Sequence, residues 1–271
     1  MKTVDQGSDI AQPRTTGKRI GILVVAYNAE STLTSVLGRI PPEIMAKIEQ
    51  VMVFDDASQD ETYEIARNYK EGVGSSKLAV FRNPENLGYG GNQKRGYQHA
   101  IEAGLDIVVL LHGDGQYAPE VMQRLLTPLE EDRAEAVFGS RMLEPGAARR
   151  GNMPLYKFVG NRILSTAQNW LLRTRFSEFH SGYRAYSTHA LAQLPLDELS
   201  DSWHFDTQII LELLARGGRI AEVPIPTYYG DEICRVNGMA YAWNCLRVTA
   251  GFVLSGRGRQ ERIFAPSRST R

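Results

Sequence analysis

The chain is short of several features, and each shortage excludes a class of protein. It has only two cysteines, Cys234 and Cys245, too few for a disulfide framework or a cysteine-based metal cluster, which fits a reducing cytoplasm. Its 31 basic residues are balanced by 31 acidic ones, which argues against nucleic-acid binding. No run reaches the roughly 20 apolar residues that span a bilayer. Residues 1–17 lack the apolar core of a signal peptide and are expected to be a disordered lead-in.

What the sequence does contain is a regular alternation of short apolar runs and helical patterns. This alternation is typical of right-handed βαβ units and predicts an α/β fold with a mostly parallel sheet. Strands are expected at 19–26, 50–54, 77–81, 105–111 and 134–138, with helices at 29–39, 60–70, 90–103 and 119–130. The later chain predicts a long helix at 153–173, an extended piece at 179–186, a helix at 203–215, a strand at 220–224 and a helix at 238–254.

Polar or glycine-rich groups follow four successive strands of this pattern. They are Tyr27-Asn28, Asp55-Asp56, Asn86-Leu87-Gly88 and His112-Gly113-Asp114. The carboxyl ends of parallel strands share one edge of a sheet, where open α/β sheets bind ligands. The sequence therefore predicts a binding site at this edge.

The cluster after the fourth strand carries the clearest chemistry. Asp114 and Gln116 are two residues apart and share one face in an extended segment. Their oxygens suit a hard divalent cation and, through it, a diphosphate. The alternative is an ordinary turn in which Asp114 caps the helix that follows Pro119.

The neighbouring clusters each allow two interpretations. One carboxylate of Asp55-Asp56 suits a base N–H or a ribose hydroxyl, or else the pair caps a turn. The glycine-rich segment at 86–92 places backbone N–H groups at a helix start, where an anion or a base would bind. Its spacing matches neither a P-loop nor a dinucleotide-binding G-x-G-x-x-G, so an NAD-binding domain is not expected.

Three charged residues of the second half are further candidates. Arg141 and Arg184 offer planar forks for a diphosphate, or are simply ion-paired arginines. Asp206 would orient an acceptor or act as a base, or is a first-turn acid favoured by the helix dipole.

Taken in this order, the motifs resemble the inverting family 2 glycosyltransferases with the GT-A fold, most closely the dolichol-phosphate mannose synthase-like branch that acts on polyprenyl phosphates. The resemblance spans about residues 19–229 and rests on segments 24–30, 53–60, 86–88, 114–116, 139–141, 181–185 and 222–225. It implies a three-layer α/β/α domain at 18–230, followed by a C-terminal helix at 231–256 and a loose basic tail at 257–271.

The resemblance also implies roles for individual residues. Catalytic roles fall to Asp114, Arg184 and Asp206, and a divalent metal, Mg²⁺ or Mn²⁺, to Asp114 and Gln116, with His112 as a third candidate ligand. Phosphate and acceptor contacts fall to Arg141, Lys157 and Arg162. The nucleotide-sugar would be bound by Ala26, Tyr27, Asn28, Glu30, Asp55, Asp56, Asn86, Gly88, His112 and Gly113.

Two departures from the family pattern stand out. The usual D-x-D-x-Q has His112 in place of its first acid, which removes one negative charge and favours Mn²⁺ over Mg²⁺. The late basic motif is altered at 231–238, where Arg235 is a partial substitute.

The expected reaction is a single in-line displacement with inversion, in which a UDP- or GDP-sugar donates to a polyprenyl phosphate at the inner face of the membrane. A stripe of Met239, Trp243, Leu246, Ala250 and Val253 would meet the membrane surface, or instead pack on the domain. The alternatives are transfer to a saccharide hydroxyl, with Asp206 as base, and a non-catalytic nucleotide-sugar-binding module. A sugar nucleotidyltransferase would need a glycine-rich segment after the first strand, and residues 26–30 lack it.

Overall fold

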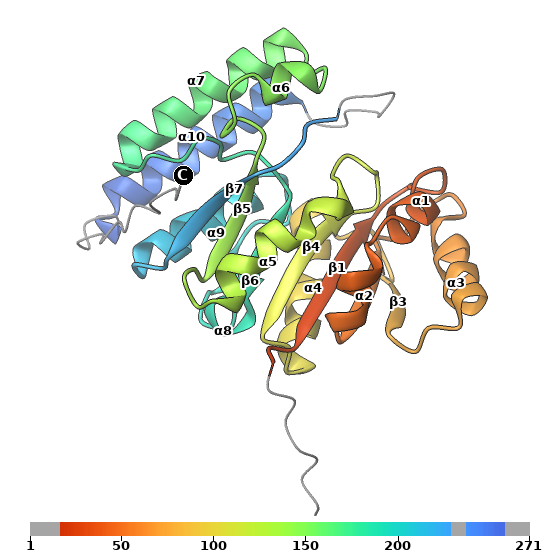
Figure 1. The fold of residues 1–271 in the computed structure, drawn as a ribbon. Coiled ribbons are helices and arrows are strands. Elements are labelled where there is room, and N and C mark those ends of the chain that lie inside the picture. Colours follow the sequence, from red (N-terminus) through yellow and green to blue (C-terminus); the bar gives the residue numbers. More distant parts are fainter. Residues whose placement is uncertain (1–16, 229–236, 258–271) are drawn as a thin grey trace, which may run out of the picture.

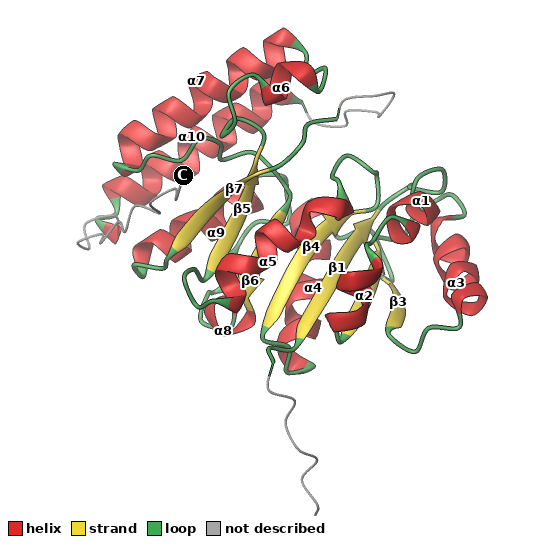
Figure 2. Cartoon of the chain, viewed as in Figure 1, coloured by secondary structure: helices red, strands yellow, loops and turns green. Residues whose placement is uncertain are grey.

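The computed structural model describes residues 17–228 and 237–257. Within them the chain forms one seven-stranded sheet with helices on both faces (Figure 1; Figure 2). The strand order is β3-β2-β1-β4-β6-β5-β7, and only β6 runs antiparallel to its neighbours β4 and β5. The strands are β1 (Ile20–Ala26), β2 (Gln50–Asp55), β3 (Leu78–Arg82), β4 (Ile107–His112), β5 (Ala136–Ser140), β6 (Arg184–Ser187) and β7 (Ile220–Pro224).

Most helices follow the expected pattern with some differences at their ends, whereas the short helices at 42–47, 147–150 and 188–191 were not expected from the sequence. They are α1 (Leu33–Gly38), α2 (Pro42–Lys47), α3 (Thr62–Val73), α4 (Gly88–Glu102), α5 (Met122–Glu130), α6 (Ala147–Arg150), α7 (Leu155–Leu172), α8 (Thr188–Leu191), α9 (Phe205–Ala215) and α10 (Gly238–Leu254). The helix expected from residue 29 begins only at Leu33, because Asn28 has a φ of +49° and a turn follows it. A 3₁₀ turn at Pro119–Val121 precedes α5.

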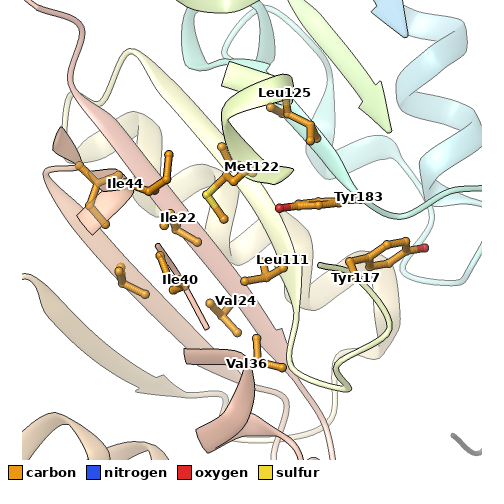
Figure 3. Packing of buried hydrophobic residues seen from close by; sticks show 14 of the residues in the cluster. Ile22, Val24, Val36, Ile40, Ile44, Leu111, Tyr117, Met122, Leu125 and Tyr183 are labelled. Carbon is orange, nitrogen blue, oxygen red and sulfur yellow. The ribbon is translucent and has the colours of Figure 1, made fainter. Parts of the chain in front are cut away.

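The sheet is buried on both faces, which explains the near-continuous apolar strands. Along β4, alternate residues enter opposite clusters: Val109 and Leu111 belong to one, Val108 and Leu110 to the other. Figure 3 shows the first cluster, where Leu111 lies among side chains of β1 and α5. The register pairs Ala26 with Asp55 and Val25 with His112, so the carboxyl ends of β1, β2 and β4 are level.

The C-terminal helix α10 packs against α7 and α9 (Figure 1). Cys245, Thr249 and Phe252 form its buried face, whereas Met239 and Trp243 of the predicted stripe are exposed. No helix in the described part of the chain is long and apolar enough to cross a membrane. The lead-in before Gly17, the altered motif at 231–236 with Arg235, and the tail after Arg257 lie outside the described residues.

Candidate functional site

A cavity of about 1640 Å³ opens at the carboxyl ends of the central strands. Its walls come from the loops after β1 and β4, the start of α4, the segment before β6 and the first turns of α7, α9 and α10. The structure brings most of the predicted site residues to this cavity: Ala26, Tyr27, Asn28, Asp56, Asn86, Gly88, His112, Asp114, Gln116, Arg141, Lys157 and Asp206 line it.

The loop after β4 presents the candidate cation ligands. Gly113 is held against β1 by a hydrogen bond from its N–H to the Val25 carbonyl at 2.9 Å. Asp114 is exposed and its Oδ1 accepts the Gln116 N–H at 2.9 Å, so Asp114 shapes its own loop; neither Pro119–Val121 nor α5 has a side-chain cap. Asp114 and Gln116 both face the cavity, as predicted from their spacing.

The donor set at this loop fits a divalent cation that shares its coordination with a ligand. His112 also lines the cavity, and its Nε2 is buried with no hydrogen-bond partner among the described residues. No group of three His, Cys, Asp or Glu side chains that would hold a metal alone occurs in the described part of the chain. A cation at Asp114, Gln116 and His112 would therefore draw further ligands from a diphosphate and water.

The two acids after β2 take different roles. Asp56 braces the cavity wall: its Oδ1 accepts the Leu87 N–H at 2.8 Å and its Oδ2 the Gly88 N–H at 3.0 Å. Gly88 has a φ of +80°, and a Cβ there would lie 2.8 Å from the Asp201 carbonyl. Asp55 lies outside the cavity lining, and burial raises the pKa of its carboxyl.

Two other predicted nucleotide contacts are also not on the cavity wall. The Glu30 carboxylate accepts the Glu61 N–H at 3.1 Å and lies outside the lining. Gly113 lies behind the loop, where its carbonyl accepts the Thr32 hydroxyl at 2.7 Å. Both residues therefore shape the loops around the cavity.

Arg184 does not line the cavity in which a diphosphate would bind. Its side chain is 1% exposed and outside the cavity lining. Its guanidinium donates to the carbonyls of Ser181 at 2.8 Å, Phe179 at 2.8 Å and Asp206 at 3.0 Å, and lies 3.6 Å from the Asp206 carboxylate. Burial by itself would lower the pKa of Arg184, but Asp206 and Tyr186 raise it. We therefore assign Arg184 a positioning role in place of the direct contact.

The other basic residues divide between two surfaces. Arg141 lines the cavity while forming a buried ion pair with Glu178, so the ion-pair interpretation is confirmed and contact with a diphosphate stays a prediction. Burial by itself would raise the pKa of Glu178, but Arg141 lowers it. Lys157 lines the cavity, whereas Arg162 is exposed and lines a separate hollow on α7 beside Trp170.

Asp206 reaches the cavity from the first turn of α9. Its Oδ2 accepts the Tyr89 hydroxyl at 2.8 Å, while its buried Oδ1 has no partner among the described residues. Tyr89 stacks on Trp203, with ring centroids 4.5 Å apart. The sequence interpretation missed Tyr89, Trp203, Tyr117, His180 and Tyr241 as cavity residues, because ring contacts between distant segments leave no local pattern.

His180 supplies a pH-dependent prediction. Burial lowers the pKa of its imidazole to about 3, against an ordinary value of 6.5. Between these values the unfolded chain binds the extra proton, so stability falls as the pH drops. We expect His180→Asn, which keeps a hydrogen-bonding side chain beside Tyr241, to flatten the fall in the free energy of unfolding between pH 6.5 and 4.5, above the range where Glu178 titrates. Urea unfolding at each pH measures this slope, and an unchanged slope would contradict the assignment.

Comparison with known proteins agrees with this geometry. The model of glycosyl transferase family 2 matches residues 21–194. The UDP-N-acetylglucosamine–dolichyl-phosphate N-acetylglucosaminyltransferase of Methanococcus voltae is 30% identical over 224 residues, covering 79% of this chain and 87% of that protein. The polyprenol monophosphomannose synthase of Mycolicibacterium smegmatis is 26% identical over 223 residues, covering 81% of this chain and 80% of that protein.

Solved structures confirm the predicted GT-A architecture. Glucosyl-3-phosphoglycerate synthase from Mycobacterium tuberculosis superposes with a TM-score of 0.63 at 21% identity, covering 90% of this chain and 82% of that one. Its complex with Mn²⁺, UDP and phosphoglyceric acid gives a TM-score of 0.60 at 18% identity, with coverages of 91% and 81%. Because the family model matches more than half of this chain, the chain belongs to glycosyl transferase family 2 and is a glycosyltransferase.

Proposed function

We propose that this glycosyltransferase moves a sugar from a nucleotide-diphospho-sugar to a polyprenyl phosphate, with inversion. The observation that carries the proposal is one cavity that holds Asp114 and Gln116 at the end of β4 together with Arg141 and Lys157. These two pairs suit a cation-bound diphosphate and a second, acceptor phosphate. Relatives named for dolichyl-phosphate and polyprenol transfer support the acceptor class.

In the proposed mechanism each group acts on a charge that develops at the diphosphate or is carried by the acceptor. A divalent cation held by Asp114, Gln116 and His112 would act as a Lewis acid toward the leaving diphosphate. Arg141, fixed by Glu178, would complement one phosphate. An acceptor phosphate is ionised near neutrality, so it attacks the anomeric carbon without a base. A hydroxyl acceptor would need one, and Asp206 would then serve.

The His112 position gives a prediction about the cation. Replacing His112 by aspartate should retain transfer and tighten Mg²⁺ binding relative to Mn²⁺, because an oxygen anion replaces a nitrogen ligand. Calorimetric titration of each metal in the presence of UDP or GDP measures the ratio of affinities. A folded His112→Asp protein without activity would show that the imidazole has a specific role of its own.

The acceptor is tested by following label from the donor. With UDP- or GDP-[¹⁴C]hexose, Mn²⁺ and undecaprenyl phosphate, label should enter an acid-labile lipid extract. Label found only in a water-soluble oligosaccharide would favour a saccharide acceptor. Nucleotide binding with neither transfer nor hydrolysis, in Mg²⁺ and in Mn²⁺, would favour a non-catalytic binding module.

We further propose that the protein binds peripherally at the inner face of the membrane through α7 and α10, which lie side by side (Figure 1). Residues 145–177 and 237–257 contain no Asp or Glu, whereas both stretches contain Lys or Arg. Large exposed apolar side chains gather on the same two helices, as expected for an interfacial surface: Leu155, Tyr156, Val159, Ile163, Trp170, Met239, Trp243 and Leu254.

Vesicle binding tests this surface without any acceptor lipid. We expect the protein to co-sediment with vesicles containing anionic phospholipid and to be released by salt. Trp170→Ser should weaken binding several-fold, whereas Val73→Ser, at an exposed site on α3, should not. Equal binding of vesicles by both variants would contradict a membrane-binding role for α7 and α10. A change in oligomeric state in Trp170→Ser would indicate instead that these helices contact another protein chain.

A further inference from the structure

A row of four aromatic rings lines the cavity beside the candidate cation ligands. Trp203 stacks on Tyr89 at 4.5 Å, Tyr89 lies 5.7 Å from His112, and His112 lies 5.2 Å from Tyr117, measured between ring centroids. All four residues line the cavity. Neighbouring rings of the row are inclined to one another by 27°, 52° and 78°, and the row begins at the loop of the candidate cation ligands, because His112 and Tyr117 flank Asp114 and Gln116 in the chain.

A buried carboxylate oxygen of Asp206 lies beside this row. The Tyr89 hydroxyl donates a hydrogen bond to Asp206 Oδ2 at 2.8 Å, and a guanidinium nitrogen of Arg184 lies 3.6 Å from the same oxygen. Asp206 Oδ1 has no partner among the described residues, although it is buried. A buried acceptor of this kind is costly unless a ligand donates to it. With Tyr89 fixing one oxygen, Asp206 aims the other at whatever lies against the aromatic row.

We propose that Trp203, Tyr89 and Asp206 form the donor-sugar subsite and select a neutral hexose over a uronic acid. The proposal rests on the proposed function, since the sugar is covalently attached to the diphosphate bound at Asp114. The ring row leads from that loop to Asp206, so the sugar lies along it. The C–H face of a pyranose packs on an aromatic surface, and a sugar hydroxyl donates to Asp206 Oδ1.

The charges around Asp206 determine whether the subsite accepts a neutral hexose or a uronic acid. Asp201 also lines the cavity there, paired with Lys94 at 2.6 Å, and the Asp206 charge is matched by Arg184 beneath it. Lys94 and Arg184 are thus each paired with a carboxylate of the protein, and neither is available to pair with a carboxylate of the ligand. A uronate would therefore face carboxylate oxygens, and like charges brought together across an interface are strongly disfavoured.

The subsite also gives Asp206 a role that does not require it to be a base. An acceptor phosphate placed next to the Asp206 carboxylate, which is paired with Arg184, would bring two like charges together and be repelled. A sugar hydroxyl, by contrast, donates a hydrogen bond to that carboxylate. Asp206 is therefore a donor-binding residue, and Trp203 is a specificity residue beside it.

Calorimetric binding in Mn²⁺ separates the sugar contribution from the nucleotide contribution. The probes are UDP, UDP-glucose, UDP-glucuronic acid, GDP and GDP-mannose. For the nucleotide that binds, we expect Trp203→Leu to leave the nucleoside diphosphate within about twofold and to weaken the neutral sugar nucleotide by about 10-fold. Val73→Ala, at an exposed apolar residue of α3 outside the cavity, is the control and should change neither.

The uronate comparison applies if uridine is the base. UDP-glucuronic acid should bind at least about 100-fold more weakly than UDP-glucose, and Asp206→Asn should narrow that ratio. Tyr89→Phe, which keeps the ring and loses the hydrogen bond to Asp206, should narrow it less and serves if Asp206→Asn fails to fold.

The outcomes are distinguishable. Equal loss of UDP-glucose and UDP binding in Trp203→Leu, or equal binding of UDP-glucose and UDP-glucuronic acid by the wild type, overturns the subsite. If GDP binds in place of UDP, the Trp203→Leu comparison of GDP with GDP-mannose decides the subsite. Failure of both UDP and GDP to bind overturns the proposed function instead.

Discussion

Replacing Asp114 by asparagine is expected to lower the rate of sugar transfer by about 10³-fold while the fold is retained. Asp114 is exposed at a loop, so its loss removes no buried contact. The amide lacks the negative charge that binds a divalent cation, and a catalytic cation contributes several kcal/mol to stabilising a leaving diphosphate. Asn at this position still accepts the Gln116 N–H that shapes the loop.

The matched control is Asp197→Asn, an exposed acid in the 3₁₀ turn Leu196–Glu198 and outside the cavity. It should leave both transfer and metal binding unchanged. Mn²⁺ affinity in the presence of UDP or GDP should fall in Asp114→Asn in parallel with the rate. A rate near that of the wild type, with normal Mn²⁺ affinity, would show that the cation is bound elsewhere.

Replacing Arg184 by methionine is expected to have the largest effect on stability, a loss of about 3–5 kcal/mol in the free energy of unfolding. The guanidinium satisfies the carbonyls of Ser181, Phe179 and Asp206 in a buried setting. Methionine fills much of the volume but leaves these acceptors unpaired, and leaves the Asp206 carboxylate without its cation. Urea unfolding of the two proteins measures the difference.

Arg39→Met is the matched control for this loss. Arg39 pairs with Glu120 at 2.7 Å on the surface, where both side chains are 40–50% exposed. Exposed pairs contribute about 0–1 kcal/mol, so this variant should be nearly as stable as the wild type. If Arg184→Met were equally stable but lost nucleotide binding, Arg184 would contact the diphosphate directly after all.

Much of the fold could be predicted because the parallel strands carry their own signal. The run at 107–111 is buried on both faces and therefore apolar throughout, and Gly113 follows it, where its N–H bonds to the Val25 carbonyl of β1. The antiparallel placement of β6 between β4 and β5 could not be predicted. It depends on pairings such as Val109 with Ala185 and Val137 with Ala185, which connect segments far apart in the chain.

Site residues could be predicted where they directly follow the end of a strand. They could not be predicted where their role depends on contact with a distant segment of the chain. Asp114 and Gln116 face the cavity as their spacing indicated. Asp55 and Asp56 are adjacent and diverge at the end of β2, and only the tertiary contact with Leu87 and Gly88 shows which one lines the cavity.

Arg184 and Tyr89 show most clearly which residue roles could not be predicted from the sequence. A lone arginine among apolar residues resembles a ligand-binding residue until its partner is known, and that partner, Asp206, is 22 residues away. The stacking of Tyr89 on Trp203 joins two segments that no local pattern connects.

The anomeric configuration of the product tests the central claim most directly. The lipid product formed from an α-linked UDP- or GDP-hexose, undecaprenyl phosphate and Mn²⁺ would be purified, and its sugar–phosphate linkage determined by ¹H and ³¹P nuclear magnetic resonance. A single in-line displacement in the Asp114 cavity predicts one hexosyl phosphate lipid with β configuration. An α-linked product, or donor consumption without any lipid-linked hexose, would contradict it.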